Sequence, residues 1–269
     1  MTNWTLSDIN WAAFDAARVD RDVLSAVKAA ALVEYNSRDY VAYLKRVFDA
    51  GSPIVAHLEQ WGEEEAQHGL ALGRWAEMAD PAFDFHKAFA RFQAGYSLPQ
   101  NNEVSVRGSR SGELISRCVV ESGTSSYYTA MKEATEEPVL AEIAGLIAAD
   151  EFRHYQLFYT NLQTCLAEER LPLWTRARVA LGRFLEAEDD ELAYAYYCAN
   201  VEEGTAEYHR KTYSKAYERV ALNLYRRKHF QRMVAMALKA VGLNPNGWFA
   251  ETLKTIAWGG LRLRRRFLT

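Results

Sequence analysis

The chain has 269 residues, of which 49% are hydrophobic, and a net charge of −3, so it can bury a substantial core and is not a disordered protein. No stretch approaches the ~20 apolar residues of a membrane-spanning helix. Residues 1–11 lack the basic and apolar regions of a signal peptide. Three scattered cysteines, Cys118, Cys165 and Cys198, do not form a disulfide framework. We therefore expect a cytoplasmic protein.

Helical periodicity runs through the whole chain and predicts an all-α fold without strands. The predicted long helices span residues 22–49, 54–78, 109–134, 139–168 and 171–203, and shorter helices follow between 206 and 258. Residues 80–106 are predicted to be irregular, with a short helix in part. We treat 1–269 as one domain, with a core at about 22–168 and a C-terminal helical extension at about 171–269.

Two segments place a Glu and a His three residues apart. Glu65 and His68 lie in WGEEEAQHGL, and Glu151 and His154 lie in IAADEFRHYQLFY. Residues i and i+3 of a helix project from the same face, so each Glu and His would point in one direction. Two such pairs on buried helices favour a shared metal site over two unrelated salt-bridged faces.

Each of these pairs has a lone Glu at a matching height on the neighbouring helix. Two residues of an antiparallel hairpin face each other when they are equally far from its turn. Glu34 and Glu65 are centred on the turn AGSP, and Glu121 and Glu151 are centred on ATEEP. Each lies about 15 residues, or roughly 22 Å of helix, from its turn. With 80–106 as a crossover, this predicts a ferritin-like four-helix bundle with additional C-terminal helices.

Six residues would then face one another inside the bundle. They are Glu34, Glu65, His68, Glu121, Glu151 and His154. One Glu from each of two helices and Glu-x-x-His from each of the other two form the ligand set of ferritin-like di-metal proteins. Carboxylate oxygens and imidazole nitrogens favour two iron ions, with manganese as the alternative. Asp150, Arg117 and Arg153 are candidates to hydrogen-bond these ligands.

The two motifs resemble those of the soluble acyl-carrier-protein desaturases. The resemblance lies in W-x-x-E-E-x-x-H-G-x-x-L from Trp61 to Leu72 and in EEPVLAEIAGLIAADEFRHYQLFYTNL from Glu136 to Leu162. It spans about residues 22–165. It implies a di-iron centre held by the same six residues, O2 as co-substrate and electrons from a ferredoxin-type donor. Analogy with such bundles also suggests a homodimer.

We therefore expect an O2-activating di-iron oxidoreductase that desaturates or hydroxylates a carrier-bound acyl chain. An amine or aromatic oxygenase is the nearest alternative enzyme. A ferritin-like iron-storage protein is a non-enzymatic alternative, which the long extension after residue 170 disfavours. A metal-free helical bundle that serves as an interaction module is a third interpretation.

Two hydroxyl groups are predicted to lie near the metals. Thr124, three residues after Glu121, could hydrogen-bond an oxygen species or relay a proton. Alternatively, its hydroxyl bonds a carbonyl of its own helix. Tyr155, four residues after Glu151, lies on roughly the same face as that ligand. With 15 Tyr in the chain, a packing role is the preferred interpretation for Tyr155 over a redox role.

Charge is unevenly distributed along the chain. Residues 210–269 hold 14 Lys or Arg against two Glu, a net charge of +12, so residues 1–209 carry −15. An acidic acyl carrier protein would be attracted to this basic region. Alternatively, the last Arg residues, interleaved with Leu and Phe, would lie on an anionic membrane surface, or the charges pair with the acidic part of the chain. Nucleic acid is disfavoured, because an active-site bundle offers it no evident role.

Overall fold

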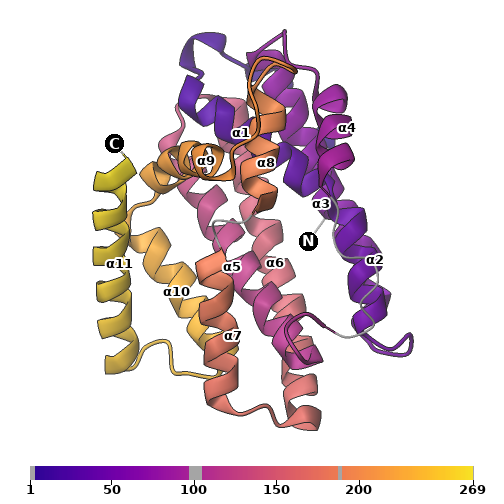
Figure 1. The fold of residues 1–269 in the computed structure, drawn as a ribbon, viewed down its shortest axis with the longest axis vertical. Helices are drawn as coiled ribbons and strands as arrows, with labels where there is room; N and C mark the ends of the chain where they lie inside the picture. Colours follow the sequence, from indigo (N-terminus) through magenta and orange to yellow (C-terminus); the bar gives the residue numbers. More distant parts are fainter. Residues whose placement is uncertain (1–3, 97–104, 187–189, 269) are drawn as a thin grey trace.

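The computed structural model describes residues 4–96, 105–186 and 190–268, and these form helices with no strand among them (Figure 1). The prediction of an all-α protein is confirmed for the described part of the chain. None of the described helices combines the length and the hydropathy needed to cross a membrane.

Three short 3-10 helices precede the α-helices: η1 (Leu6–Asp8), η2 (Trp11–Ala13) and η3 (Ala16–Arg18). The α-helices up to residue 169 are α1 (Arg21–Tyr35), α2 (Ser37–Val47), α3 (Val55–Ala79), α4 (Phe85–Gly95), α5 (Arg110–Ala134) and α6 (Pro138–Glu169). Those that follow are α7 (Leu173–Leu185), α8 (Asp190–Asn200), α9 (Arg210–Leu224), α10 (Arg227–Val241) and α11 (Trp248–Leu268).

Helices α1, α3, α5 and α6 form the centre of the molecule. Helix α1 packs along α3, α5 packs along α6, and α3 also contacts α6, so the two predicted hairpins lie against each other (Figure 1). Local sequence sets the ends of α5 and α6. The side chain of Ser109 accepts a hydrogen bond from Gly112 N at the start of α5, and Pro138 begins α6 after the capping residue Glu137.

Close approach of α1 and α3 depends on a glycine. A Cβ added at Gly69 would lie 2.6 Å from the backbone nitrogen of Tyr35, so a larger residue would push the helices apart. Gly69 directly follows His68, and Tyr35 directly follows Glu34. The contact therefore brings the candidate ligands of α1 and α3 to the same level.

One predicted helix, 22–49, is two helices in the structure. Helix α1 ends at Tyr35, and α2 begins at Ser37 after the buried Asn36. The hydroxyl of Ser37 donates to the carbonyl oxygen of Gly62 at 2.7 Å, which ties the break to α3. The prediction missed this break because apolar periodicity continues on both sides of it, and Gly62 is far away in the sequence.

The C-terminal predictions need two further corrections. The single helix predicted at 171–203 is divided into α7 and α8, because α7 packs against α5 and α10, whereas α8 packs against α1, α4 and α9. The last helix was predicted to end near 258, but α11 continues to Leu268.

Part of the predicted crossover at 80–106 is α4, and 97–104 lie outside the described residues.

Candidate metal centre

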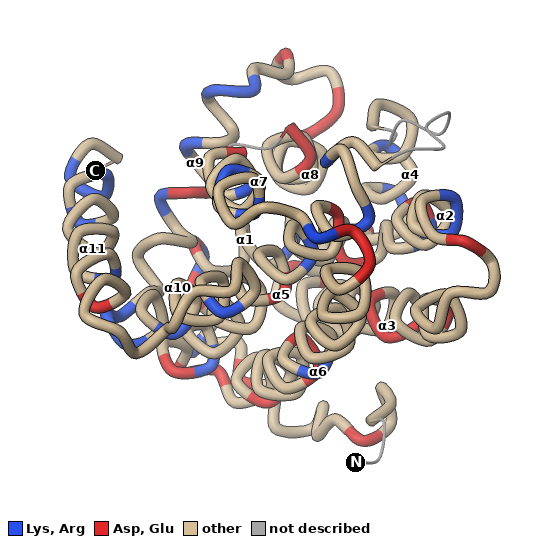
Figure 2. The backbone as a smooth tube through the Cα atoms, turned by 90° about the horizontal axis from the view of Figure 1, so that it is seen from below, with Lys and Arg blue, Asp and Glu red and all other residues tan. Residues whose placement is uncertain are grey.

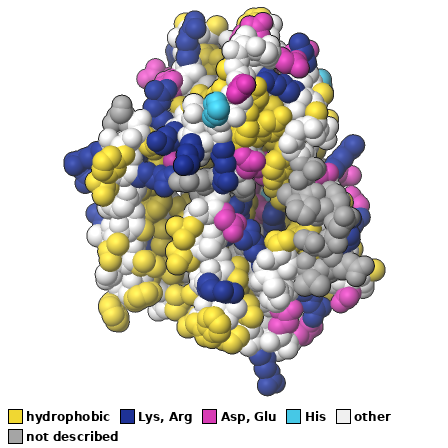
Figure 3. All heavy atoms as spheres, viewed as in Figure 1, with side chains coloured by type: hydrophobic (Ala, Val, Ile, Leu, Met, Phe, Trp, Pro, Cys, Tyr) yellow, Lys and Arg dark blue, Asp and Glu magenta, His cyan; other side chains and the backbone are white. Residues whose placement is uncertain are grey.

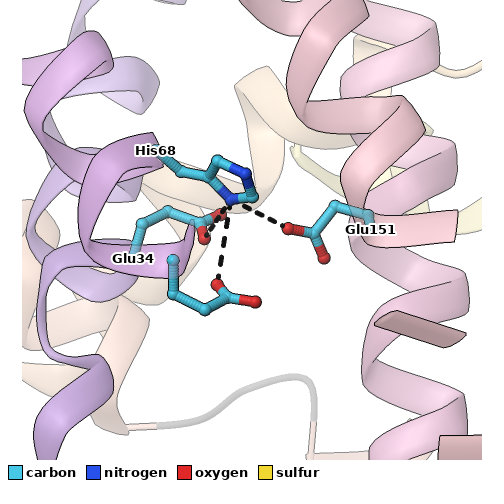
Figure 4. Close-up of side chains that lie close together, drawn as sticks. Glu34, His68 and Glu151 are labelled. Carbon is cyan, nitrogen blue, oxygen red and sulfur yellow. Dashed lines mark ion pairs between the residues drawn. The ribbon is translucent and has the colours of Figure 1, made fainter. Parts of the chain in front are cut away.

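All six predicted ligands converge between the four central helices. Glu34 lies on α1, Glu65 and His68 on α3, Glu121 on α5, and Glu151 and His154 on α6. None of the six residues is more than 8% exposed. Figure 4 shows His68 and Glu34 facing Glu151 across the space between their helices.

The six residues form two overlapping groups of four. One group is Glu34, Glu65, His68 and Glu151, and the other is Glu65, Glu121, Glu151 and His154. The ligand atoms within each group lie within 4.8 Å of one another. Glu65 and Glu151 belong to both groups, so two cations held here would share these carboxylates.

Each histidine turns Nδ1 toward the carboxylates. His68 Nδ1 lies 3.2 Å from Glu151 Oε1 and 3.7 Å from Glu34 Oε2 (Figure 4). His154 Nδ1 lies 3.0 Å from Glu65 Oε1 and 3.9 Å from Glu121 Oε2. The two imidazoles are 5.8 Å apart between ring centroids. Both nitrogen donors therefore face the same cluster of oxygen atoms.

The outer nitrogen of each histidine is held by another carboxylate. His68 Nε2 lies 3.2 Å from Asp150 Oδ2, and His154 Nε2 lies 2.7 Å from Glu64 Oε2. Asp150 directly precedes Glu151 on α6, and Glu64 directly precedes Glu65 on α3. Each histidine is therefore held by a carboxylate from the other helix of this pair. With the proton on Nε2, each ring donates outward and leaves the Nδ1 lone pair for a metal, which is the usual orientation of a ligating histidine.

Arg153 connects the two supporting carboxylates. Its guanidinium lies 2.6 Å from Asp150 Oδ1 and 3.4 Å from Glu64 Oε2. Asp150 therefore contacts a candidate ligand, as predicted, whereas Arg153 contacts the two supporting carboxylates and none of the six candidate ligands. The third candidate, Arg117, instead has its ion pair with Glu113 at 3.7 Å, one turn further from the cluster along α5. The sequence spacing did not reveal this, because Glu113 and Glu121 are equally spaced from Arg117.

The sequence interpretation missed three residues that contact the candidate ligands or their supporting carboxylates. They are Glu64, Trp4 and Tyr128. The indole of Trp4 donates to Asp150 Oδ2 at 2.8 Å and stacks on His68, and the Tyr128 hydroxyl donates to Glu34 Oε1 at 2.5 Å. A sequence pattern could have identified Glu64, because each motif has an acidic residue directly before its candidate ligand Glu. No pattern marked Trp4 or Tyr128.

Electrostatics make this cluster retain protons when no cation is present. Burial, together with the charges of Glu151 and Glu34, raises the pKa of Glu65 well above its usual range. Burial likewise raises the pKa of Glu121, with the charge of Glu151 adding to the effect. Burial also opposes ionisation of Glu151, but its contacts with His68 and His154 lower its pKa to about 2. Protonation of Glu65 and Glu121, but not of Glu151, thus reduces the repulsion among the carboxylates.

His68 has a shifted pKa for a related reason. Burial alone would lower the pKa of this imidazole, but the nearby carboxylates of Asp150, Glu151 and Glu34 raise it well above its usual value. The cluster therefore holds protons that a divalent cation would displace on binding.

The buried polar atoms of the cluster fit a metal. His68 Nδ1, His154 Nδ1 and Glu151 Oε1 are buried and have no hydrogen-bond partner. Buried polar atoms are otherwise almost always satisfied in folded proteins. These three unpaired atoms point into one carboxylate-rich space, where a cation would satisfy all of them at once.

The hydroxyl of Thr124 contacts both a candidate ligand and the backbone of its own helix, so the proton-relay and the helix-bonding interpretations both stay predictions. Its hydroxyl is hydrogen-bonded to Glu151 Oε2 and also lies 3.3 Å from the carbonyl oxygens of Val120 and Glu121. Tyr155, in contrast, is 3% exposed and donates its hydroxyl hydrogen to Met236 O at 2.8 Å. Tyr155 therefore links α6 to α10.

Part of the basic C-terminal charge is paired within the chain. Lys228 lies 2.7 Å from Glu133, and Arg219 lies 3.3 Å from Asp22. Arg264 lies 2.8 Å from Glu218 (Figure 2 shows the distribution of charged residues). Helix α11 also exposes apolar side chains along its outer face, where Trp248 is 82% and Phe267 is 80% exposed (Figure 3).

Comparison with known proteins leaves the family open: no family model matches the chain, and no curated protein matches its sequence. The likeness to the acyl-carrier-protein desaturases therefore stays a prediction from the two motifs. The geometry supports a narrower conclusion. The chain is an all-helical protein whose buried Glu and His clusters could hold metal ions.

Proposed function

We propose that the protein is an O2-activating oxidoreductase with two iron ions held in a ferritin-like bundle of α1, α3, α5 and α6. The observation that carries the proposal is the pair of overlapping groups that share Glu65 and Glu151. Two adjacent cations with shared carboxylates match the ligand set of ferritin-like di-metal proteins. The described part of the chain offers no cysteine to this site, which favours iron or manganese over a thiolate-bound metal.

Each residue of the site has a distinct role in this proposal. Glu65 and Glu151, which belong to both groups, would help to hold both ions. Glu34 and His68 would hold one ion with them, and Glu121 and His154 would hold the other. Four carboxylates would balance the charge of two divalent ions and relieve their own repulsion. Asp150 and Glu64 orient the two imidazoles through Nε2.

Two iron ions in such a site supply the capacity to reduce O2 and to oxidise an unactivated C–H bond. The chain contributes a dry, preorganised environment, since the six residues are buried between four helices. In this proposal, Thr124 moves a proton through its hydrogen bond to Glu151 Oε2. Tyr128 holds Glu34 in position through its hydrogen bond.

The proposed reaction is desaturation or hydroxylation of an acyl chain, on the basis of the motif resemblance. A ferredoxin-type protein would donate the electrons, and a homodimer is the proposed assembly. An acyl carrier protein is the proposed macromolecular partner of the basic C-terminal region. The ion pairs of Lys228 and Arg219 reduce the charge available to it.

Metal analysis tests this function directly. Full-length protein purified with an iron supply is expected to contain about two iron ions per chain and to show oxo-bridged absorption after exposure to O2. Glu151→Ala should lower the iron content to well below one ion, because both groups lose a shared ligand. Glu63→Ala is the matched control, since Glu63 is an exposed residue of α3 beside the motif. Iron content that is equal in the two variants, or absent from the wild type, would refute the proposal.

A further inference from the structure

A cavity of about 270 Å³ lies near the N-terminal end of α5. Its lining includes Tyr40 and Tyr43 of α2, Glu113 and Arg117 of α5, and Arg107. The volume is close to the lower limit for small-molecule sites, and tyrosine walls with a few charged groups are typical of such sites.

Arg117 is the unusual residue of this cavity. It is only 9% exposed, and its guanidinium lies 4.7 Å from the centre of the Tyr40 ring. Its Nε is buried without a hydrogen-bond partner, and among the described residues its guanidinium makes no hydrogen bond. Its ion pair with Glu113 is long, at 3.7 Å. A buried guanidinium with unused donors is costly unless a ligand satisfies it.

The neighbouring charged groups already have partners of their own. Glu113 Oε2 accepts hydrogen bonds from Tyr43 at 2.8 Å and from Ser105 at 2.7 Å. Arg107 makes two hydrogen bonds of 2.6 Å to the two oxygens of Glu186. The planar fork of Arg117 therefore remains for an anion, and its geometry matches the two oxygens of a carboxylate.

The cavity is close to the candidate metal centre. Glu113, Arg117 and Glu121 follow one another at intervals of four residues and share one face of α5. Arg117 is thus one helical turn, or about 6 Å along the axis, from Glu121. A ligand bound by Arg117 would lie beside the half of the cluster formed by Glu121 and His154.

We propose that this cavity binds a small organic carboxylate, with Arg117 holding the carboxylate group and Tyr40 and Tyr43 contacting the apolar part. Binding depends only on the cavity, whereas the role of the ligand as a substrate rests on the function proposed above. A carrier-bound thioester has no free carboxylate. As a substrate, a free acid bound in this cavity would be an alternative to the carrier-bound acyl chain within the same oxidoreductase function.

Calorimetric titration of the full-length, metal-free protein tests the binding. Phenylacetate and hexanoate are the carboxylate probes, phenylacetamide is the uncharged comparison, and inorganic phosphate is the comparison anion. We expect saturable binding of at least one carboxylate, with the amide bound about tenfold more weakly or worse, because it lacks the charge that Arg117 recognises. Arg117→Gln should weaken carboxylate binding by about tenfold or more, and Arg117→Lys by less, because Lys keeps the charge but not the fork.

Arg74→Gln is the matched control, since the Arg74 guanidinium also stacks on an aromatic ring, that of Trp11, at 4.1 Å but outside the cavity. Its carboxylate affinity should equal that of the wild type. The proposal is overturned if neither carboxylate binds, if acid and amide bind equally, if phosphate binds more tightly than both acids, or if Arg117→Gln binds normally. Should Arg117→Gln fail to fold, Arg117→Lys and the acid–amide comparison on the wild type decide the outcome.

The iron content of the same variants separates the two proposals. Arg117→Gln should keep its iron, because Arg117 makes no hydrogen bond to the six candidate ligands. Carboxylate binding by a protein that never takes up iron would refute the proposed function alone. Normal iron loading without carboxylate binding would refute the present inference alone.

Discussion

The two halves of the candidate metal centre have the same ligand types but different surroundings. In the Glu34 half, Tyr128 donates to Glu34, and Trp4 covers His68 while it bonds Asp150. In the other half, no hydroxyl or indole group of the described chain donates to Glu121. That half instead lies one turn of α5 from the cavity that contains Arg117.

The two halves therefore differ in the residues that surround them. The Glu34 half is closed by aromatic residues from the N-terminal segment and from α5. The Glu121 half lies one turn of α5 from the proposed carboxylate cavity, so a ligand bound there would lie on that side of the cluster. A repeated ligand pattern can therefore produce a chemically asymmetric site, because the surrounding residues do not repeat.

The largest expected effect concerns protons held by both halves. Burial and neighbouring carboxylates raise the pKa values of Glu65 and Glu121, and the surrounding carboxylates raise that of His68, so these groups stay protonated to higher pH than free Glu and His. A cation must displace those protons. Metal affinity should therefore increase as the pH rises through the raised pKa values and fall as the pH is lowered.

Calorimetry of Mn(II) binding in buffers with different ionisation enthalpies measures this release. We expect more than one proton to be released per chain at neutral pH. Binding that releases no protons and shows no dependence on pH would contradict the protonation pattern described for the cluster.

A smaller effect should distinguish the supports of the two histidines. Asp150→Asn and Glu64→Gln each remove the charge that orients one imidazole, and such changes typically weaken metal binding by about 10–100-fold. Asp150→Asn should have the larger effect, because Asp150 lies 2.6 Å from Arg153 and accepts from the buried indole of Trp4. Glu64 lies 3.4 Å from the same guanidinium and accepts from the neutral amide of Gln60. Titration with Mn(II), followed by the paramagnetic signal of the free ion, measures both variants.

Equal losses in the two variants would show that the shorter Arg153 contact and the Trp4 indole do not strengthen the support of His68, and would weaken the comparison of the halves. Glu142→Gln provides the control on α6, since Glu142 accepts a hydrogen bond from Asn10 and does not belong to the cluster.

The smallest expected change in metal binding is at Thr124. Thr124→Val removes the hydroxyl that is hydrogen-bonded to Glu151 but keeps a similar shape, so iron content should be unchanged. If the hydroxyl moves a proton, turnover should slow by about 10²–10⁴-fold or release peroxide in place of product. Peroxide yield per O2 consumed measures this. Unchanged coupling would leave Thr124 with the helix carbonyl contacts of Val120 and Glu121 as its role.

Local helical geometry determined much of the candidate site. The spacing of Glu65 from His68 and of Glu151 from His154, with the positions of the two turns, was sufficient to predict which six residues meet. This worked because helix rise and period are nearly constant, so distance from a turn fixes height within a hairpin. It failed at Asn36, where the periodicity continues across a break that a contact with α3 stabilises.

Tertiary structure alone decided the environment of those six residues. His68 and Asp150 are 82 positions apart, His154 and Glu64 are 90 apart, and Trp4 and Asp150 are 146 apart. Whether Arg117 turns to the cluster or to the cavity also depends on α2, through the ring of Tyr40. Such contacts depend on how the two hairpins and the N-terminal segment pack together, which the period of a single helix does not specify.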